Sequence, residues 1–222
     1  MKFGLDMTYP PTVDQATHMQ SLGYTFCIAY VGGPRASADN AWHQIDGERY
    51  PVRDLSPFFR DGFLPCYVGR NVPYDQGWQF TAEQGITDGH EANTYTGACG
   101  FDSDSVVVLD VQYGTYERYP LATLRYIAGF VSRCNAAGHP VGVYGDIALM
   151  NALRQGLDVD GKWGADQLLT NRTDEPSETW SRFDPASPPP WMYWQCGNGT
   201  VAGVSVDYNT ATDDALFAKY AG

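Results

Sequence analysis

The chain has 222 residues and a formal net charge of -12, with 14 Lys and Arg against 26 Asp and Glu. Hydrophobic residues make up 43% of it, which indicates a folded globular protein and excludes a disordered one. Because phosphate groups are bound by basic side chains, this composition argues against nucleic acid and anionic membranes as partners, and no segment resembles a membrane span.

Short apolar runs alternate along the chain with longer amphipathic segments, a pattern that is typical of repeated β–α units. In the first half of the chain, strands are predicted at 3–6, 26–31 and 63–68, and helices at 12–22, about 52–60 and 78–98. Pro11 and Gly23 mark the two ends of the first helix. A Gly-Gly-Pro turn follows the second strand and leads into a polar loop at about 34–51.

In the second half, the segment 105–110 is the clearest strand, because it is apolar on both faces like a buried parallel strand. A helix is predicted at 119–137 from the helical spacing of its apolar residues. The remaining predicted elements are strands at 141–144, 162–165, 191–195 and 204–207, helices at 146–156 and 211–220, and an irregular loop at about 171–190.

Eight strands with intervening helices predict an α/β fold in a single domain, residues 1–222, arranged as a compact (β/α)8 TIM barrel. An open doubly wound sheet is the alternative. The glycine-rich loops with which such sheets bind nucleotides are absent from this sequence.

In a (β/α)8 barrel, the active site lies at the carboxyl ends of the strands. Asp6, Asp110 and Asp207 each end a predicted strand, and we expect them to be catalytic. Residues near the same strand ends are expected to bind the substrate: Gln112, Tyr30, Tyr144, Asp166, Trp194 and Gln195. Several carboxylates among Tyr and Trp fit glycoside cleavage, in which one acid protonates the leaving oxygen and another charge stabilises the oxocarbenium-like carbon.

Each of these residues also has an ordinary structural interpretation. A carboxylate at a strand end often caps the next helix, and Tyr144 and Trp194 can equally belong to the core. The sequence begins a zinc motif at His90, but Thr94 stands where its second histidine is needed, so neither a metal nor another cofactor is predicted. The five cysteines form no C-x-x-C pair, and we expect them to be reduced and buried.

The motifs at the predicted strand ends resemble those of the family 25 glycoside hydrolases, which are lysozyme-type muramidases. They are Gly4-Leu-Asp6, Val108-Leu-Asp110-Val-Gln112, Val143-Tyr144, Trp163, Tyr193-Trp-Gln195 and Val206-Asp-Tyr-Asn209. More closely, segments 23–33 and 85–92 resemble an actinobacterial glycoside-hydrolase-like domain related to these enzymes. The resemblance implies a (β/α)8 barrel that acts on bacterial cell-wall glycan.

Within this resemblance, Asp6 would line the sugar site, Asp110 would orient the reacting N-acetyl sugar, and Asp207 would complete the acidic ring. The lysozymes have the pattern D-x-E on this strand, with Glu as the general acid, whereas this chain has Gln112. A glutamine forms hydrogen bonds but has no acidic proton to donate. Another carboxylate must therefore supply the acid if cleavage occurs, and Asp6, Asp166 and Asp207 are the candidates.

Two hypotheses remain open at this point. The first is a protein that binds and hydrolyses peptidoglycan or a related polysaccharide. The alternative is a non-catalytic carbohydrate-binding module, or a structural module of a phage particle or envelope, that has lost the general acid. The N-terminal segment 1–11 has no apolar stretch of signal-peptide length. We expect a location at the cell envelope, outside the cell or in a phage particle.

Overall fold

A computed structural model describes residues 1–36, 42, 51–70, 80–112, 114–156, 161–165, 192–218 and 220, and the structural statements below concern these residues. The described strands are β1 (Lys2–Asp6), β2 (Phe26–Gly32), β3 (Gly62–Val68), β4 (Val107–Asp110), β5 (Val141–Gly145), β6 (Gly161–Ala165), β7 (Tyr193–Val201) and β8 (Val204–Ala211). The described helices are α1 (Val13–Ser21), α2 (Pro51–Leu55), α3 (Ala82–Ala98), α4 (Thr115–Arg118), α5 (Pro120–Ala136) and α6 (Ile147–Gly156).

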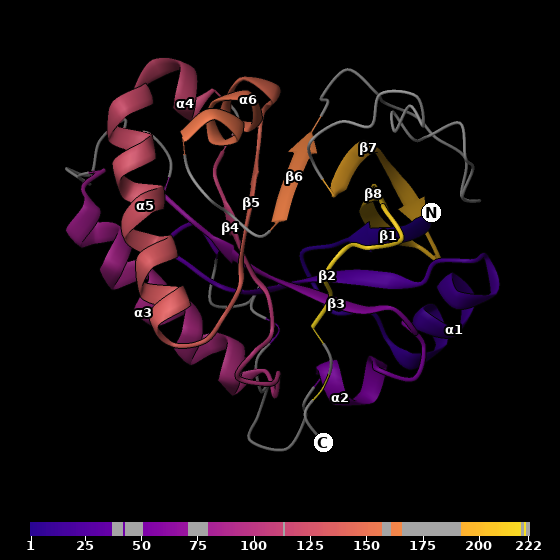
Figure 1. Cartoon of the computed structure of the whole chain (residues 1–222). Coiled ribbons are helices and arrows are strands. Elements are labelled where there is room, and N and C mark those ends of the chain that lie inside the picture. Colours follow the sequence, from indigo (N-terminus) through magenta and orange to yellow (C-terminus); the bar gives the residue numbers. More distant parts are fainter. Residues whose placement is uncertain are drawn as a thin grey trace.

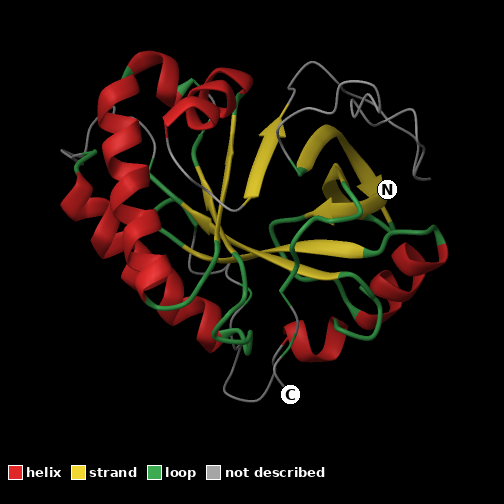
Figure 2. Ribbon diagram, in the orientation of Figure 1, coloured by secondary structure: helices red, strands yellow, loops and turns green. Residues whose placement is uncertain are grey.

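The strands form one strongly curled, mixed sheet (Figure 1). They pair in chain order from β1 to β8, and β8 pairs back with β1. Strands β1 to β7 run parallel, whereas β8 is antiparallel to both of its neighbours. Helices α3 and α5 lie side by side on the outside of the sheet, and α1 and α2 lie beside the opposite part of it (Figure 2).

The prediction of a (β/α)8 TIM barrel is therefore wrong, although the α/β class is correct. A hairpin joins β7 to β8 where the barrel requires a helical crossover. Its turn residues Ala202 and Gly203 have φ angles of 51° and 77°. Positive φ at both central residues is typical of the type I′ turn, whose twist matches an antiparallel ribbon. The division of the chain into a single domain stays a prediction.

The predicted helix at 211–220 is also wrong for the described residues after β8. Ala218 forms an antiparallel bridge with Phe63, in which each residue accepts the backbone N–H of the other. Tyr220 forms a second bridge with Phe101. Ala218 and Tyr220 are thus paired with distant segments rather than included in a helix. The predicted loop at about 171–190 lies outside the described residues.

Several predicted helices are confirmed with small shifts of their ends. Helix α1 begins after Thr12, whose hydroxyl accepts the backbone N–H of Gln15 at 3.3 Å, while the Gln15 side chain accepts the N–H of Thr12 at 2.8 Å. This reciprocal pair is a capping box. The glycines of α3 do not break it: a Cβ at Gly85 would overlap the backbone of Tyr126, so glycine permits the close approach of α5.

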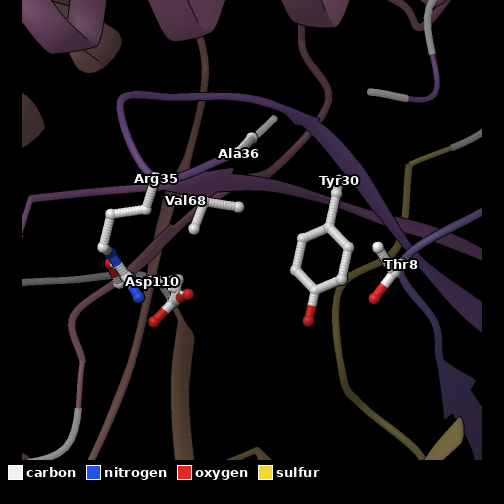
Figure 3. Close-up of a pocket in the computed structure, with 6 residues that line it drawn as sticks. All are labelled: Thr8, Tyr30, Arg35, Ala36, Val68 and Asp110. Atoms are coloured by element: carbon white, nitrogen blue, oxygen red, sulfur yellow. Dashed lines mark hydrogen bonds and ion pairs between the residues drawn. The ribbon is translucent and has the colours of Figure 1, made fainter. Parts of the chain in front are cut away.

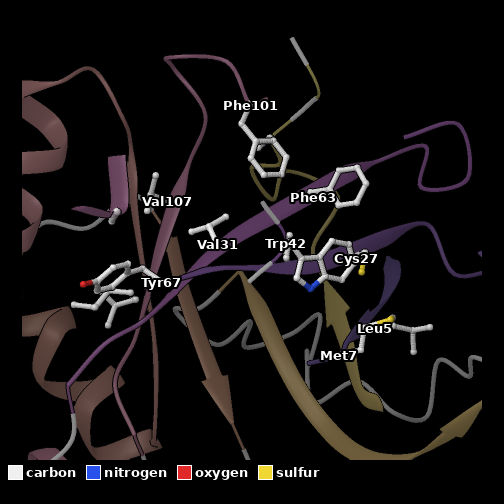
Figure 4. Close-up of a cluster of buried hydrophobic side chains, with 14 of the residues drawn as sticks. Leu5, Met7, Cys27, Val31, Trp42, Phe63, Tyr67, Phe101 and Val107 are labelled. Carbon is white, nitrogen blue, oxygen red and sulfur yellow. The ribbon is translucent and has the colours of Figure 1, made fainter. Parts of the chain in front are cut away.

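Two buried clusters occupy the two faces of the sheet. The outer cluster lies between strands and helices and includes Leu5, Cys27, Phe63, Tyr67 and Val107 (Figure 4). The inner cluster is enclosed by the strands and consists of Phe26, Ile28, Leu64, Cys66, Val106, Val108, Tyr193, Ala211 and Ala215. All five cysteines are buried and free. Among the described helices, none has the length and apolar character needed to cross a membrane.

Candidate active site

Alternation along the strands brings a set of polar residues to one end of the inner face. Successive residues of a strand point to opposite faces, so residues two apart share a face. Tyr30 follows Phe26 and Ile28 on β2, and Asp110 follows Val108 on β4 and Val106 directly before this strand. Both polar residues therefore lie directly above the inner cluster, at the carboxyl end of their strands.

The antiparallel strand β8 places a second carboxylate beside that of β1. Asp6 is the last residue of β1, and its partner in the β1–β8 register is Asp207. Directly opposed residues of an antiparallel pair have their side chains on the same face, with Cβ atoms about 4.5–5.5 Å apart. Asp6 is 5% exposed. Two carboxylates thus share one poorly solvated place.

Burial and like charge govern the ionisation of this pair. Burial raises the pKa of Asp6 well above its usual range, and the neighbouring charge of Asp207 raises it further. The hydroxyl of Tyr30 donates a hydrogen bond to Asp6 and opposes the increase. Burial also raises the pKa of Asp207 to about 6, against a hydrogen bond from Gln195. Burial and mutual repulsion therefore both favour the protonated form in this pair.

The side chain of Gln195 links Asp207 to Tyr144. The Tyr144 hydroxyl donates to Oε1 of Gln195. The amide nitrogen is then the group that can donate to Asp207, since the oxygen is already an acceptor. Burial raises the pKa of Tyr144, as do the charges of Asp110, Asp6 and Asp207, so its phenol stays protonated. All three carboxylates therefore act electrostatically on one tyrosine.

The third carboxylate carries its own counter-ion. Nη2 of Arg35 lies 2.8 Å from Oδ2 of Asp110, and the two side chains are 17% and 14% exposed. Burial raises the pKa of Asp110, whereas the charge and the hydrogen bond of Arg35 lower it. A pocket of about 240 Å³ opens beside this ion pair, lined by Thr8, Tyr30, Arg35, Ala36, Val68 and Asp110. The oxygen atoms of Thr8, Tyr30 and Asp110 point toward the same side of it (Figure 3).

The structure therefore brings six of the expected site residues together at the end of the inner face where β1 to β4 end, which we call the mouth of the sheet. They are Asp6, Asp110, Asp207, Tyr30, Tyr144 and Gln195. Two others lie elsewhere. Trp194 is fully buried in the outer cluster, on the face of β7 opposite to Gln195. Gln112 lies two residues beyond the end of β4 and is exposed. Asp166 lies outside the described residues.

Arg35 and Cys66 belong to the site but were missing from the sequence-based set. Cys66 lies on the inner face of β3, and the charges of Asp110 and Asp6 add to burial in raising the pKa of its thiol. Arg35 directly follows the Gly-Gly-Pro turn after the second predicted strand, and nothing in the sequence connects it with Asp110. The strand-end carboxylate Asp146, by contrast, has a structural role, because it accepts the N–H of Leu149 at 2.8 Å and caps α6.

Among the described residues, no group of three or more His, Cys, Asp or Glu side chains is arranged to hold a metal ion. The site instead consists of buried carboxylates, tyrosines and one arginine at the strand ends of a curled α/β sheet. A pair of carboxylates at one site is the group that glycoside hydrolases use. The family described as "Rv2525c-like, glycoside hydrolase-like domain" matches residues 17–213, and the chain belongs to this family. The resemblance drawn from the sequence motifs is thereby confirmed.

Several solved structures share the fold. The Tat-secreted protein Rv2525c of Mycobacterium tuberculosis, in complex with L-tartrate, is 17% identical, with 98% of each chain covered and a TM-score of 0.68. The spore cortex lytic enzyme SleM of Clostridium perfringens is 16% identical over 97% of this chain and 69% of its own, with a TM-score of 0.59. A muramidase from Acremonium alcalophilum is 14% identical over 97% and 95%, with a TM-score of 0.58. No curated protein sequence matches the chain.

Proposed function

We propose that this protein binds bacterial cell-wall glycan in the pocket beside Asp110 and hydrolyses a glycosidic bond at the neighbouring carboxylates. The observation that carries the proposal is the register of β1 and β8, which sets Asp6 opposite Asp207 at a mouth that also contains Asp110. A glycosidase needs one carboxyl that is protonated and another that is charged. Two structural neighbours, a spore cortex lytic enzyme and a muramidase, support a cell-wall substrate.

Asp207 is the proposed general acid. With a pKa of about 6, about half of the Asp207 carboxyls retain the proton at pH 6, where an ordinary aspartate has lost it. Asp207 donates this proton to the glycosidic oxygen as the bond from that oxygen to the anomeric carbon breaks. Water then adds its hydroxyl to the anomeric carbon, and its remaining proton returns to Asp207. General acid catalysis of this kind contributes roughly 10²–10⁴-fold in rate.

Asp110 is the proposed anionic partner. Its ion pair with Arg35 favours the charged form and fixes the carboxylate at the edge of the pocket. A charged carboxylate there can orient the acetamido group of an N-acetyl sugar, the role that the resemblance to muramidases implies. Tyr30 and Tyr144 offer phenol groups to the same ligand, since both lie at the mouth and stay protonated.

A second candidate function is glycan binding without cleavage. The observation that favours it is Gln112, an exposed amide at the position where the resembling lysozymes have their acid. If Asp207 does not reach the glycosidic oxygen, the pocket retains its sugar contacts but loses its acid. For either function we propose that the protein acts at the envelope or outside the cell, because the structural neighbour Rv2525c is a Tat-secreted protein.

The test compares the wild-type protein with Asp207→Asn and Asp110→Asn on purified peptidoglycan and on soluble N-acetylated oligosaccharides. Hydrolysis predicts new reducing ends with the wild type and a loss of at least 10²-fold in Asp207→Asn. Asp104→Asn is the matched control, because Asp104 is exposed in the turn before β4. Binding without new reducing ends in every variant supports the binding module. Absence of both binding and cleavage in the wild type refutes both functions.

A further inference from the structure

The guanidinium of Arg35 holds both the side chain and the backbone of Asp110. Nη2 lies 2.8 Å from the carboxylate oxygen Oδ2 and donates to the backbone carbonyl of Asp110 at 3.0 Å. Nε donates to the carbonyl of Gly69, at the end of β3. Figure 3 shows the arginine reaching toward the Asp110 carboxylate at the edge of the pocket. Three acceptors therefore determine where this cation lies: the carboxylate and the carbonyl of Asp110 and the carbonyl of Gly69.

The turn after β2 packs on the end of β3 and thereby positions Arg35. Gly33 has a φ of +119°, and a Cβ there would overlap the backbone carbonyl of Val68. The turn therefore lies directly on the end of β3. The N–H of Arg35 donates to the carbonyl of Val68 at 3.4 Å and holds the turn there, and the N–H of Ala36 donates to the carbonyl of Gly33 at 3.0 Å and closes the turn itself. A glycine is needed at 33 because another side chain has neither the space nor the backbone conformation.

The segment that contains Gly69, an acceptor of Arg35, is held in place by an ion pair with helix α3. Arg70 follows Gly69 and forms a two-point ion pair with Asp88 of α3, from Nε to Oδ2 at 2.7 Å and from Nη2 to Oδ1 at 3.0 Å. Asp88 is 2% exposed and also accepts hydrogen bonds from Tyr126 at 2.7 Å and Gln84 at 2.8 Å. Four donors thus satisfy this buried carboxylate, and α3 and α5 fix the end of β3.

The backbone continues this support to Asp110. The N–H of Gly69 donates to the carbonyl of Asp110 at 3.1 Å, the same oxygen that accepts Nη2 of Arg35. A displacement of Gly69 would therefore move both the acceptor of Arg35 and the backbone of Asp110. The contacts form one continuous chain from Asp88 through Arg70 and Gly69 to Arg35 and Asp110.

We propose that Arg35 is a positioning residue that keeps Asp110 charged and aimed at the glycan, and that the Arg70–Asp88 ion pair holds the Gly69 carbonyl on which Arg35 depends. The inference rests on the proposed function for the role of Asp110. It assigns different tasks to the two arginines. Arg35 sets the charge and the direction of Asp110, whereas Arg70 sets only the place where Arg35 is anchored.

The first experiment measures the titration of the Asp110 carboxyl by carbon NMR without glycan, with Asp110→Asn used to assign the signal. Arg35→Gln should raise the midpoint by one to three pH units, since an opposite charge at this distance has an effect of that size. Arg35→Lys keeps the charge but loses the forked geometry, and a smaller rise is expected. Asp88→Asn loosens the anchor of Arg35 but keeps its charge, so a rise of the midpoint smaller than that in Arg35→Gln is expected. Arg125→Gln, an exposed change on α5, is the control.

The second experiment measures the pH profile and the affinity for peptidoglycan fragments of the same variants. Arg35→Gln should move the acidic limb of the profile, which reports the ionisation of Asp110, to higher pH, and Asp88→Asn should move this limb less and weaken binding at least threefold. An unchanged Asp110 midpoint in both Arg35 variants overturns the proposal, and a midpoint in Asp88→Asn equal to that of the wild type overturns the supporting role of the Arg70–Asp88 ion pair. If the wild type neither binds nor cleaves glycan while the midpoints shift as expected, the proposed function fails and the charge-setting role stands.

Discussion

The ionisation of Asp207 makes the stability of the protein depend on pH in a defined direction. Its pKa of about 6 in the folded protein lies above the value of 3.8 that applies to an unperturbed aspartate. The folded state therefore binds this proton more tightly than the unfolded state does. The resulting stability is fully present below pH 3.8 and is lost as the pH rises through about 6.

The magnitude follows from the difference between the two pKa values. Each pH unit of difference is worth about 1.4 kcal/mol, so Asp207 costs the folded protein about 3 kcal/mol above pH 7 relative to pH 3. Asp207→Asn removes the ionisable group and keeps the size of the side chain. From pH 3 to pH 7, we expect the free energy of unfolding of the variant to increase by about 3 kcal/mol relative to that of the wild type.

Urea unfolding of both proteins at pH 3.5, 5 and 7.5 measures this double difference. Carboxylates whose environments are unchanged contribute equally to wild type and variant, so their contributions cancel. Asp6 is the exception, because the charge of Asp207 raises its pKa, and the loss of this effect in Asp207→Asn adds to the double difference in the same direction. Asp104→Asn should give a constant offset at every pH, because Asp104 is exposed. If the stability difference between the wild type and Asp207→Asn is the same at pH 3.5 and pH 7.5, the assignment of a raised pKa to Asp207 is wrong.

Three further substitutions test how the fold supports the site. Gly33→Ala should destabilise the protein by about 1–3 kcal/mol in thermal unfolding and weaken glycan binding, because φ at this position is +119° and the new methyl meets Val68. Gly85→Ala should cost at least about 2 kcal/mol in urea unfolding, because the methyl group would force α3 away from Tyr126 of α5. Thr12→Ala should cost about 1 kcal/mol in the same assay through loss of the capping box and leave the affinity for glycan unchanged.

The parallel part of the fold could be predicted because its local patterns are strong. The segments that form β2, β3 and β4 are short apolar runs, and both of their faces are buried in the structure. Thr12, Pro11 and Gly23 mark the ends of the first helix in ways that depend only on nearby residues. Local physical chemistry therefore sufficed for this part of the chain.

The direction of β8 could not be predicted in the same way. Residues 196–200, which extend β7, contain two glycines and an asparagine, and these residue types are usually depleted from strands. The sequence around 211–220 has apolar residues among charges, yet Ala218 pairs with Phe63, a partner far away in the chain. Both features are decided by pairing with distant segments, which overrides local preference.

Arg35 illustrates the same limit for the site. The carboxylates could be selected because each lies at the end of an apolar run, whereas Arg35 lies in a polar turn with no periodic pattern. Its partner Asp110 is 75 positions away, and the contact exists only because Gly33 lets the turn lie on β3. A long-range ion pair of this kind has no signal in a single sequence.

The antiparallel direction of β8 also changes the reason why Asp207 lies at the mouth. The sequence predicts Asp207 at the carboxyl end of a parallel strand. In the structure β8 is antiparallel, so it starts near the carboxyl end of β1 and places Asp207 opposite Asp6 within its length. Directly opposed like charges destabilise a sheet, and Arg35 offsets only the third carboxylate, Asp110. The fold thus retains an Asp6–Asp207 pair that costs stability whenever both groups are charged. A cost of this kind at the end of a well-packed inner cluster is typical of a site selected for its chemistry rather than for packing.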